Sequence, residues 1–239
     1  MDVLATALLA LFTAGYLVLA GADIGVGMLL PWLGRDQDER RTVLAAIGPF
    51  FLGNEVWLVA TAGVMAGAFP GLEHTLLYEH RGAFVLLLLG WVVRDAGLWW
   101  RGRVDAVAWR TGCDTMTVAG SWALALALGA VFGEVLAGTP LPAPVMAGLL
   151  ALHGGGFAKW RLTGAPLGRA VGSYPLTAAV LVASTVLAGL RLDVGHAAAG
   201  PASVRIVALS VAVLLPFLLA AQALTWWTFR HRVTGPGYL

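Results

Sequence analysis

The chain has 239 residues, of which 59% are hydrophobic and 12% are charged, and its mean hydropathy is +0.82. This composition excludes a disordered chain, which needs low hydrophobicity and high charge. It also argues against a soluble domain, whose surface needs more polar side chains. The net charge of +2 says little alone, and a lone cysteine, Cys113, cannot form an internal disulfide or a thiolate metal cluster. We therefore predict an all-α, polytopic transmembrane helical bundle.

Membrane-spanning helices need about 20 mostly apolar residues, and about seven stretches meet that requirement. In chain order they cover residues 3–32, 43–69, 80–100, 115–136, 144–157, 170–190 and 206–229, the fifth with room to extend at both ends. We find no internal repeat, low-complexity segment or long linker between them. The sequence therefore predicts a single integral-membrane helical domain over residues 1–239.

Basic residues alternate between the connections that join these stretches. All but three of the 15 Lys and Arg lie at or beyond the ends of the first, third, fifth and seventh stretches, the exceptions being Arg81, Arg191 and Arg205. Because cytoplasmic connections carry the excess of Lys and Arg, we predict an outside N-terminus and a cytoplasmic C-terminus. The expected location is the inner (plasma) membrane, crossed several times.

Two acidic residues, Asp23 and Glu55, lie well inside predicted spans. At 1.5 Å per residue they would be about 13 Å and about 18 Å from the cytoplasmic ends of their helices. The first two helices form an antiparallel pair, so the carboxyls can face each other at similar depth. Burial and mutual repulsion help such carboxyls to hold a proton near neutral pH, which suits a proton relay. The alternative for Asp23 is a structural role, in which it caps a helix or pairs with Arg94.

The neighbours of Glu55 are also polar. Asn54 precedes it, and Trp57 is predicted near mid-membrane, where its indole N–H needs a partner. Pro49 lacks an N–H and frees a backbone carbonyl one turn earlier, which makes a local binding site for water or a side chain. In the charged connection before this helix, Asp36 and Asp38 are candidate helix caps, against the alternative of a solvated loop.

His153 is the one histidine that the sequence places deep in a span, and three glycines follow it. A haem ligand is conceivable there, but a hydrogen-bonding or packing histidine is the favoured interpretation, because we find no second deep histidine or facing methionine. The remaining histidines fall near span ends or in loops. The Gly21-xxx-Gly25 and Gly63-xxx-Gly67 spacings are typical of helix-packing faces. We find no P-loop, dinucleotide fingerprint or HExxH motif, and nothing that supports nucleic-acid binding.

Several motifs together resemble subunit II of the cytochrome bd quinol oxidases. The two most specific are the segment Gly21-Ala-Asp23-Ile-Gly25-Val-Gly27-Met-Leu29 and the segment Gly53-Asn54-Glu55-Val-Trp57-Leu58. Weaker matches follow in the same order as in the family: Gly34-Arg35, Glu39-Arg40-Arg41, Gly48-Pro49, Phe69-Pro70, Arg94, Trp109-Arg110, Gly120-Ser121, Phe132-Gly133 and Leu152-His153-Gly154. The resemblance divides the chain into a family-like part, residues 1–170, and a shortened C-terminal two-helix part, residues 171–239.

This resemblance implies a partner. In the family, subunit II pairs with a haem-bearing subunit I, and the pair oxidises quinol and reduces O2 to water. The catalytic redox centres, haems b and d, are then expected on the partner. No cofactor is expected on this chain, and whether it binds a quinone stays an open question. The resemblance further implies a cytoplasmic proton path through Asp23 and Glu55, with Asn54, Trp57, Arg94 and His153 in supporting roles. Quinol and membrane lipids are the other expected partners.

The sequence departs from the family in two places. Leu52 stands where the family often has an aspartate, so Glu55 would carry more of a proton route. The chain is also shorter, and we expect one helix fewer than in the family. Two alternatives therefore stay open: a stand-alone proton-coupled membrane carrier that uses Asp23 and Glu55, and a purely structural assembly subunit.

Overall fold

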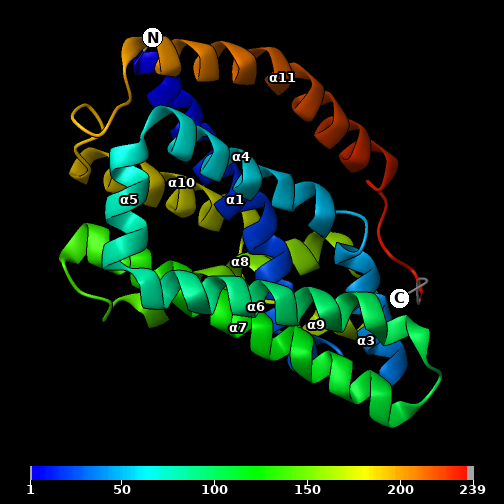
Figure 1. Cartoon of the computed structure of the whole chain (residues 1–239). Helices are drawn as coiled ribbons and strands as arrows, with labels where there is room; N and C mark the ends of the chain where they lie inside the picture. Colours follow the sequence, from blue (N-terminus) through cyan, green and yellow to red (C-terminus); the bar gives the residue numbers. More distant parts are fainter. Residues whose placement is uncertain (1, 236–239) are drawn as a thin grey trace. The chain divides into compact units, whose positions relative to one another are not determined.

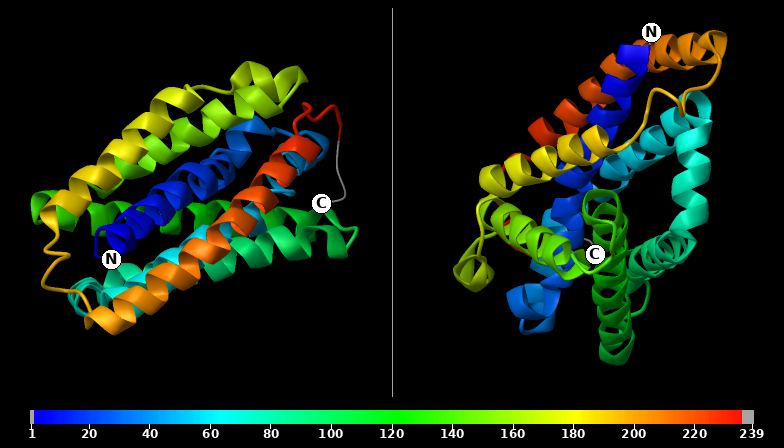
Figure 2. Two further views of the ribbon diagram at one scale, coloured as in Figure 1. Left: turned by 90° about the horizontal axis from the view of Figure 1, so that it is seen from above. Right: turned by 90° about the vertical axis from the view of Figure 1, so that its left-hand side faces the viewer.

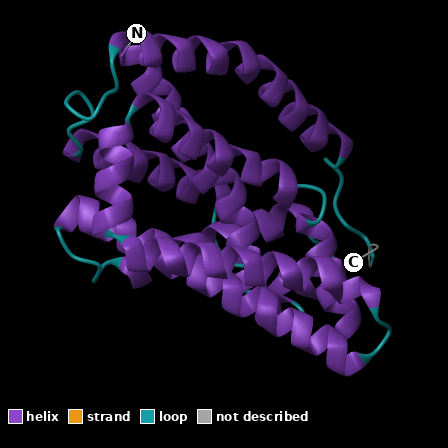
Figure 3. Cartoon of the chain, viewed as in Figure 1, coloured by secondary structure: helices purple, strands orange, loops and turns teal. Residues whose placement is uncertain are grey.

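The computed structural model describes residues 2–235, and over that range the chain is helical with short connections and contains no strand (Figure 3). Six of its helices are long and apolar enough to cross a membrane. The prediction of an all-α, polytopic bundle is confirmed. The helices, labelled in Figure 1, are α1 (Asp2–Met28), α2 (Leu30–Leu33), α3 (Gln37–Ile47), α4 (Phe51–Ala68), α5 (Pro70–Glu79), α6 (Arg81–Trp100), η1 (Arg101–Arg103), α7 (Val107–Ala137), α8 (Ala143–Arg161), α9 (Gly164–Arg169), α10 (Tyr174–Arg191) and α11 (Pro201–Thr228).

Each predicted span contains a helix. The six candidate spanning helices are α1, α4, α6, α7, α10 and α11, and α8 occupies the remaining predicted span. Helix α8 is less apolar because its last turn carries Lys159 and Arg161. The predicted span count and the predicted orientation both stay predictions. Helix α5, which begins at Pro70, was not predicted.

The prediction of one continuous second helix was wrong at residues 48–50. Helix α3 ends at Ile47, and α4 begins at Phe51 after a turn that contains Pro49. Proline has no N–H for the carbonyl four residues earlier, and here this interrupts the helix rather than only loosening it. Glu55 therefore lies in the second turn of α4, about 6 Å along its axis from Phe51, and not deep within a single long helix.

Helix α7 begins at Val107, earlier than residue 115 where we predicted its start. The extension adds two turns at its N-terminal end and brings Asp114 into the helix, where it is buried. A buried carboxylate needs compensating partners, and these are described below.

The chain divides into two compact units. Unit 1 comprises Met1–Ala20, Phe50–Arg81 and Leu181–Arg230, and unit 2 comprises Gly21–Pro49, Gly82–Val180 and His231–Leu239. Each is described by itself. Asp23, Arg94 and His153 belong to unit 2, whereas Asn54, Glu55 and Trp57 belong to unit 1. Whether the chain behaves as a single domain stays a prediction.

In unit 1, α4 and α11 run alongside each other in opposite directions (Figure 2). At one end the Phe50 ring packs on Trp226 and Phe229, with ring centroids 5.2 Å and 6.1 Å away. At the other end Gly67 faces Val207, so closely that a Cβ on the glycine would lie 2.8 Å from the valine side chain. Gly67 thus has the packing role that we predicted, while Gly63 faces open space.

In unit 2, α7 and α8 form an antiparallel pair joined by a tight turn. Gly138, with φ +67°, ends α7 in the left-handed conformation that glycine adopts most easily. Further along the pair, a Cβ on Gly129 would lie 2.5 Å from the Ala143 carbonyl oxygen. Helix α1 lies as close to α8, because a Cβ on Gly25 would be 2.0 Å from the Leu150 carbonyl oxygen. Gly25 therefore also packs as predicted.

The segment 231–233, which follows α11, is tied to the end of α8 within unit 2. The Val233 N–H donates to the Arg161 carbonyl at 2.8 Å, and Thr163 Oγ1 donates to the Val233 carbonyl at 2.8 Å. The buried Arg161 guanidinium donates to the His231 carbonyl, and Arg232 donates to the Leu162 carbonyl. The segment 231–233 is thus held by backbone and side-chain hydrogen bonds together.

Candidate functional site

Asp23 is fully buried, with 0% of its surface exposed, near the C-terminal end of α1. The glycines around it bring α1 into direct backbone contact with α8. A Cβ on Gly154 would lie 2.2 Å from the Gly25 carbonyl carbon. Only glycine allows two helix backbones to approach so closely, and the approach encloses the carboxyl of Asp23 within unit 2.

His153 lies beside this crossing and is also 0% exposed. Its Nδ1 is 2.7 Å from Thr177 Oγ1, and its ring stacks on Tyr174 with centroids 4.5 Å apart and planes inclined by 18°. Asp23 lies two residues before Gly25, whose backbone contacts that of Gly154, the residue after His153. The side chains of Asp23, Tyr174, His153 and Thr177, which we call the buried polar group, therefore join α1, α8 and α10.

The favoured interpretation of His153 as a hydrogen-bonding and packing residue agrees with this arrangement. No three His, Cys, Asp or Glu side chains in residues 3–235 come together in a way that could hold a metal ion. The expectation that this chain binds no haem stays a prediction, because it concerns the assembled complex.

Arg94 is also buried in unit 2, on α6. Its Nη1 pairs with Asp95 Oδ1 at 2.8 Å, within the same helix. The backbone of Arg94 faces α7, because a Cβ on Gly120 of α7 would be 2.5 Å from the backbone nitrogen of Arg94. The pair with Asp95 compensates the charge of Arg94, and the predicted pairing of Arg94 with Asp23 stays untested.

In unit 1, Asn54 lies at the centre of a polar network. Its Nδ2 donates to the Leu19 carbonyl at 3.1 Å, and its Oδ1 accepts from Gln222 Nε2 at 2.9 Å. Gln222 Oε1 accepts from the buried Trp57 indole N–H at 3.4 Å. The Trp57 ring packs on Gly15, where no other residue would fit, and edge-on against Phe12. Trp57 thus has the partner that its predicted depth requires.

Glu55 follows Asn54 and is 9% exposed. It belongs to unit 1 and Asp23 to unit 2, so their predicted facing arrangement stays a prediction. Leu52 lies on the outer surface of unit 1 and is 49% exposed. The side chain at this position therefore points away from Asn54 and Trp57, which are buried on the other side of α4.

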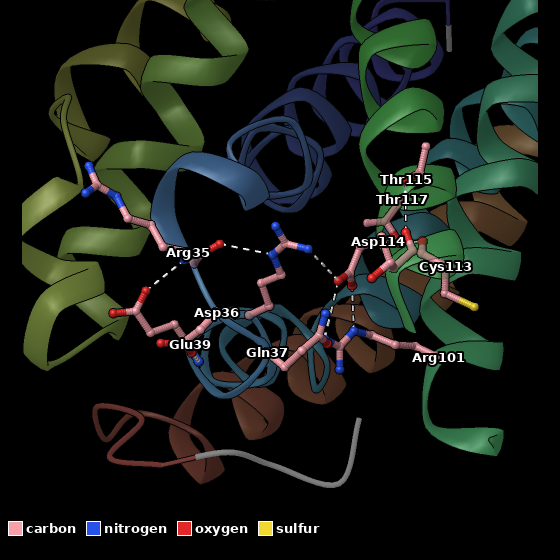
Figure 4. Close-up of polar contacts among 12 residues, drawn as sticks. Arg35, Asp36, Gln37, Glu39, Arg101, Cys113, Asp114, Thr115 and Thr117 are labelled. Atoms are coloured by element: carbon pink, nitrogen blue, oxygen red, sulfur yellow. Dashed lines mark hydrogen bonds and ion pairs between the residues drawn. The ribbon is translucent and has the colours of Figure 1, made fainter. Parts of the chain in front are cut away.

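A second polar cluster lies at the end of unit 2 where α3 and α7 begin (Figure 4). Asp114 accepts from Arg101 Nε at 2.6 Å and from Arg40 Nη1 at 3.2 Å. Arg101 is 1% exposed and also donates to Gln37 Oε1 at 2.9 Å. One carboxylate is therefore shared by two guanidinium groups, and we call Asp114, Arg101, Arg40 and Gln37 the ion cluster.

The start of α3 is held on its other side by Glu39. Its carboxylate pairs with Arg169 at 2.6 Å and accepts from the Arg35 N–H at 2.7 Å. These hydrogen bonds lower the pKa of Glu39 from 4.5 to about 2 and raise the pKa of Arg169. Asp36 caps α3 by accepting from the Glu39 N–H at 2.8 Å, as predicted for this residue.

These contacts bring the connections 34–40, 101–103 and 162–169 to one end of unit 2. They are three of the basic connections that we assigned to the cytoplasm. The predicted alternation of spans requires them to lie on the same side of a membrane, and their position at one end of unit 2 is compatible with that prediction.

Several of these residues were not predicted. Gln222 lies in a long uncharged stretch, and a lone amide in such a stretch was the available signal. Tyr174 and Thr177 fall at the start of α10, which begins four residues after the predicted boundary. Asp114 was assigned to a connection, and its burial depends on two arginines from distant segments.

Comparisons with known proteins identify the relatives of this chain. The model of a family described as cytochrome bd terminal oxidase subunit II matches residues 1–190. The cytochrome bd ubiquinol oxidase subunit 2 of Bacillus subtilis (strain 168) is 37% identical over 136 residues, which is 57% of this chain and 40% of that protein. The cytochrome bd-I ubiquinol oxidase subunit 2 of Escherichia coli (strain K12) is 34% identical over 126 residues, 53% of this chain and 33% of that protein.

A probable cytochrome oxidase subunit 2 of Haemophilus influenzae is 35% identical over 126 residues, again 53% of this chain and 33% of the relative. The aligned part of this chain thus spans between a third and two fifths of the length of the curated relatives it matches. The family model extends beyond residue 170, where the motif resemblance ended.

Proposed function

The chain belongs to the cytochrome bd terminal oxidase subunit II family, and from this we propose that it is the non-haem subunit of a bd-type quinol oxidase. It is a multi-pass inner-membrane protein. In this proposal it binds a haem-bearing subunit I, which carries haems b and d. The pair oxidises quinol and reduces O2 to water, and this chain supports the partner and supplies a proton path from the cytoplasm.

The burial of Asp23 is the observation that carries the proton path. A carboxyl with no exposed surface costs several kcal/mol unless it is protonated, paired or hydrated. Asp23 lies in one of the two segments with the clearest family motif, two residues before the Gly25 backbone that contacts Gly154 beside the titratable His153. Acids placed in this way are functional candidates by default in membrane proteins.

Glu55 is the second acid of the path. It lies in the second turn of α4, close to the interrupted helix at Pro49. Asn54 and Trp57 hold this turn in place through Gln222 and Leu19, so their role is to position Glu55. Leu52 cannot carry a proton, which leaves Glu55 as the acid of this motif.

Co-purification tests the partner. We expect affinity-tagged chain, extracted in mild detergent, to bring a second membrane subunit with haem absorbance. Recovery of the chain alone and without haem, from cells that contain an intact oxidase operon, would contradict the oxidase proposal. It would favour the stand-alone carrier, for which the interrupted helix at residues 48–50 is the specific supporting feature.

Turnover of the purified complex tests the proton path. Asp23→Asn and Glu55→Gln remove the exchangeable proton with little change of shape. We expect roughly tenfold or greater loss of quinol-driven O2 uptake, with haem content unchanged. Asp193→Asn is the matched control, because Asp193 is an exposed acid in the connection between α10 and α11. Full turnover in both variants would leave a structural assembly role as the better description.

A further inference from the structure

His153 is held in a defined hydrogen-bonding arrangement. Thr177 Oγ1 has one proton, and the hydroxyl lies 2.8 Å from the Ser173 carbonyl oxygen of the preceding turn, to which it donates. Thr177 Oγ1 also lies 2.7 Å from Nδ1 of His153. Because the hydroxyl proton is already used, Oγ1 is the acceptor in this second hydrogen bond, and Nδ1 carries the hydrogen. In the neutral ring Nε2 is therefore the basic atom. The same contacts serve the protonated ring without any rearrangement, because Nδ1 donates in both states.

The surroundings of His153 suit a group that changes charge. The Tyr174 ring covers one face of the imidazole, and the ring of Phe157, one turn further along α8, has its centroid 5.9 Å from that of Tyr174. Asp23 comes from α1, where the Gly25 backbone touches the Gly154 backbone next to His153. A carboxyl and an imidazole enclosed together can share one proton with no net buried charge.

The groups that could alter the charge of His153 can be named. From α1 there is Asp23, and from α10 there is Tyr174. Helices α7 and α3 also pack against α8. Their charged residues are Arg110, Asp114 and Glu134 on α7 and Asp38, Glu39, Arg40 and Arg41 on α3. Arg161 and Lys159 lie on the last turn of α8. Asp23 is therefore the acid whose charge we connect with His153.

We propose that His153 is a proton-carrying residue of the path that contains Asp23, with Thr177 fixing its tautomer. The proposal rests on the proposed function and extends it. Nε2 takes up one proton arriving from the cytoplasmic side of the path to give imidazolium, whose charge the Asp23 carboxylate balances. The same Nε2–H proton then passes on toward subunit I, which restores the neutral ring. Thr177 takes no part in the transfer and acts as a positioning residue through Nδ1.

The pH profile of turnover tests this in the complete oxidase. A histidine titrates closer to neutral pH than other side chains. We expect His153→Gln to lower quinol-driven O2 uptake by about tenfold and to remove the inflection of the profile between about pH 5 and 8. His196→Gln, an exposed histidine in the α10–α11 connection, is the matched control and should retain the wild-type profile.

Parallel variants separate this proposal from the proposed function. If Asp23→Asn lowers turnover while His153→Gln keeps both the rate and the pH profile, the proton path stands and the role of His153 is overturned. If Asp23→Asn has full turnover, the proton path through Asp23 fails, and with it the role of His153. Thr177→Ser should behave as wild type, whereas Thr177→Val should shift the inflection; equal profiles for the two would also overturn the proposal.

A spectroscopic measurement does not depend on variants that assemble poorly. In the wild-type complex with 15N-labelled histidine, we expect the His153 signal at pH 8 to show hydrogen on Nδ1 and none on Nε2. The signal is assigned by its loss in the His153→Gln complex. If that variant does not assemble, residue-pair labelling of the wild-type complex assigns it instead. Hydrogen on Nε2 at that pH would overturn the assigned tautomer and with it the proposal.

Discussion

Gly154 decides how closely α8 can approach α1. A Cβ at this position would meet the Gly25 carbonyl carbon at 2.2 Å and the Val26 nitrogen at 2.3 Å. Both are backbone atoms, which cannot move aside as a flexible side chain can. The side chains of Asp23 and His153 stand beside this crossing, so the geometry of the buried polar group depends on a residue that has no side chain.

We expect Gly154→Ala to destabilise unit 2 by about 1–3 kcal/mol, the usual cost of overpacking. Gly148→Ala is the control in the same helix. No atom lies within 4 Å of a Cβ at Gly148, and alanine is the better helix former by about 1 kcal/mol. Thermal denaturation in detergent should therefore place Gly148→Ala at or above wild type and Gly154→Ala below it. Equal midpoints would show that the helices separate easily.

Gln222 connects α11 to the motif that contains Glu55. It donates to Asn54 Oδ1 and accepts from Trp57 Nε1. Replacement by Leu removes both interactions, and we expect a loss of about 1–2 kcal/mol, as found for interhelical hydrogen bonds in membranes. Thr225→Val is the control, since the Thr225 hydroxyl lies in an exposed hydrogen bond to Ala221 of its own helix. Chemical or thermal unfolding in detergent measures the stability of both variants. Equal losses of stability in Gln222→Leu and Thr225→Val would contradict a role for the Gln222 amide.

Among the helices, α3 is the element whose position depends most on charge. It is short, it ends at the Pro49 turn, and its first turns contact Arg101, Asp114 and Arg169 from three other segments. Four of its residues are buried apolar side chains: Val43, Leu44, Ala46 and Ile47. Apolar packing holds one end of α3, and ion pairs hold the other.

Asp114→Asn should loosen this end of unit 2. Removing one partner of a buried ion pair leaves a buried charge uncompensated, which costs about 3–5 kcal/mol, and here Arg101 and Arg40 both lose the carboxylate. Asp105→Asn is the matched control, because Asp105 is exposed and its pair with Arg110 lies at the surface. We expect faster proteolysis within residues 34–49 in Asp114→Asn only. Identical cleavage rates in the two variants would contradict it.

For the whole molecule, pH should act on stability mainly through paired acids. The pKa of Glu39 falls from 4.5 to about 2 in the folded chain, chiefly because Arg169 hydrogen-bonds to it. A lowered folded pKa means that the stabilisation is complete above pH 4.5 and is lost as the pH falls toward 2. The pair is therefore intact throughout the physiological range.

The midpoint temperature of thermal unfolding in detergent should thus decrease as the pH is lowered from 4.5 to 2. In Glu39→Gln this decrease should be smaller. Asp38→Asn is the control, because Asp38 is an exposed neighbour in the same helical turn. If the Glu39→Gln curve parallels wild type over this window, the Glu39–Arg169 pair does not contribute to stability.

The apolar runs predicted where nearly every helix lies, because length and hydropathy are properties of a continuous segment. They did not predict the turn at residues 48–50, the early start of α7 or helix α5. Pro49 was recognised, but whether a proline bends or ends a helix depends on what packs around it. Asp114 extends α7 because Arg40 and Arg101, far apart in the chain, supply its compensating charge.

The sequence was sufficient to assign the membrane class and the family motifs and to single out Asp23 and Glu55 as candidate site residues, since each is a local pattern of residues. The tertiary structure alone decided which partners meet: Gln222 with Asn54 across 168 residues, Arg101 with Asp114, and His153 with Thr177. Buried polar groups must find partners wherever the packed helices bring them. That requirement depends on contacts between distant segments, and no local pattern of residues contains it.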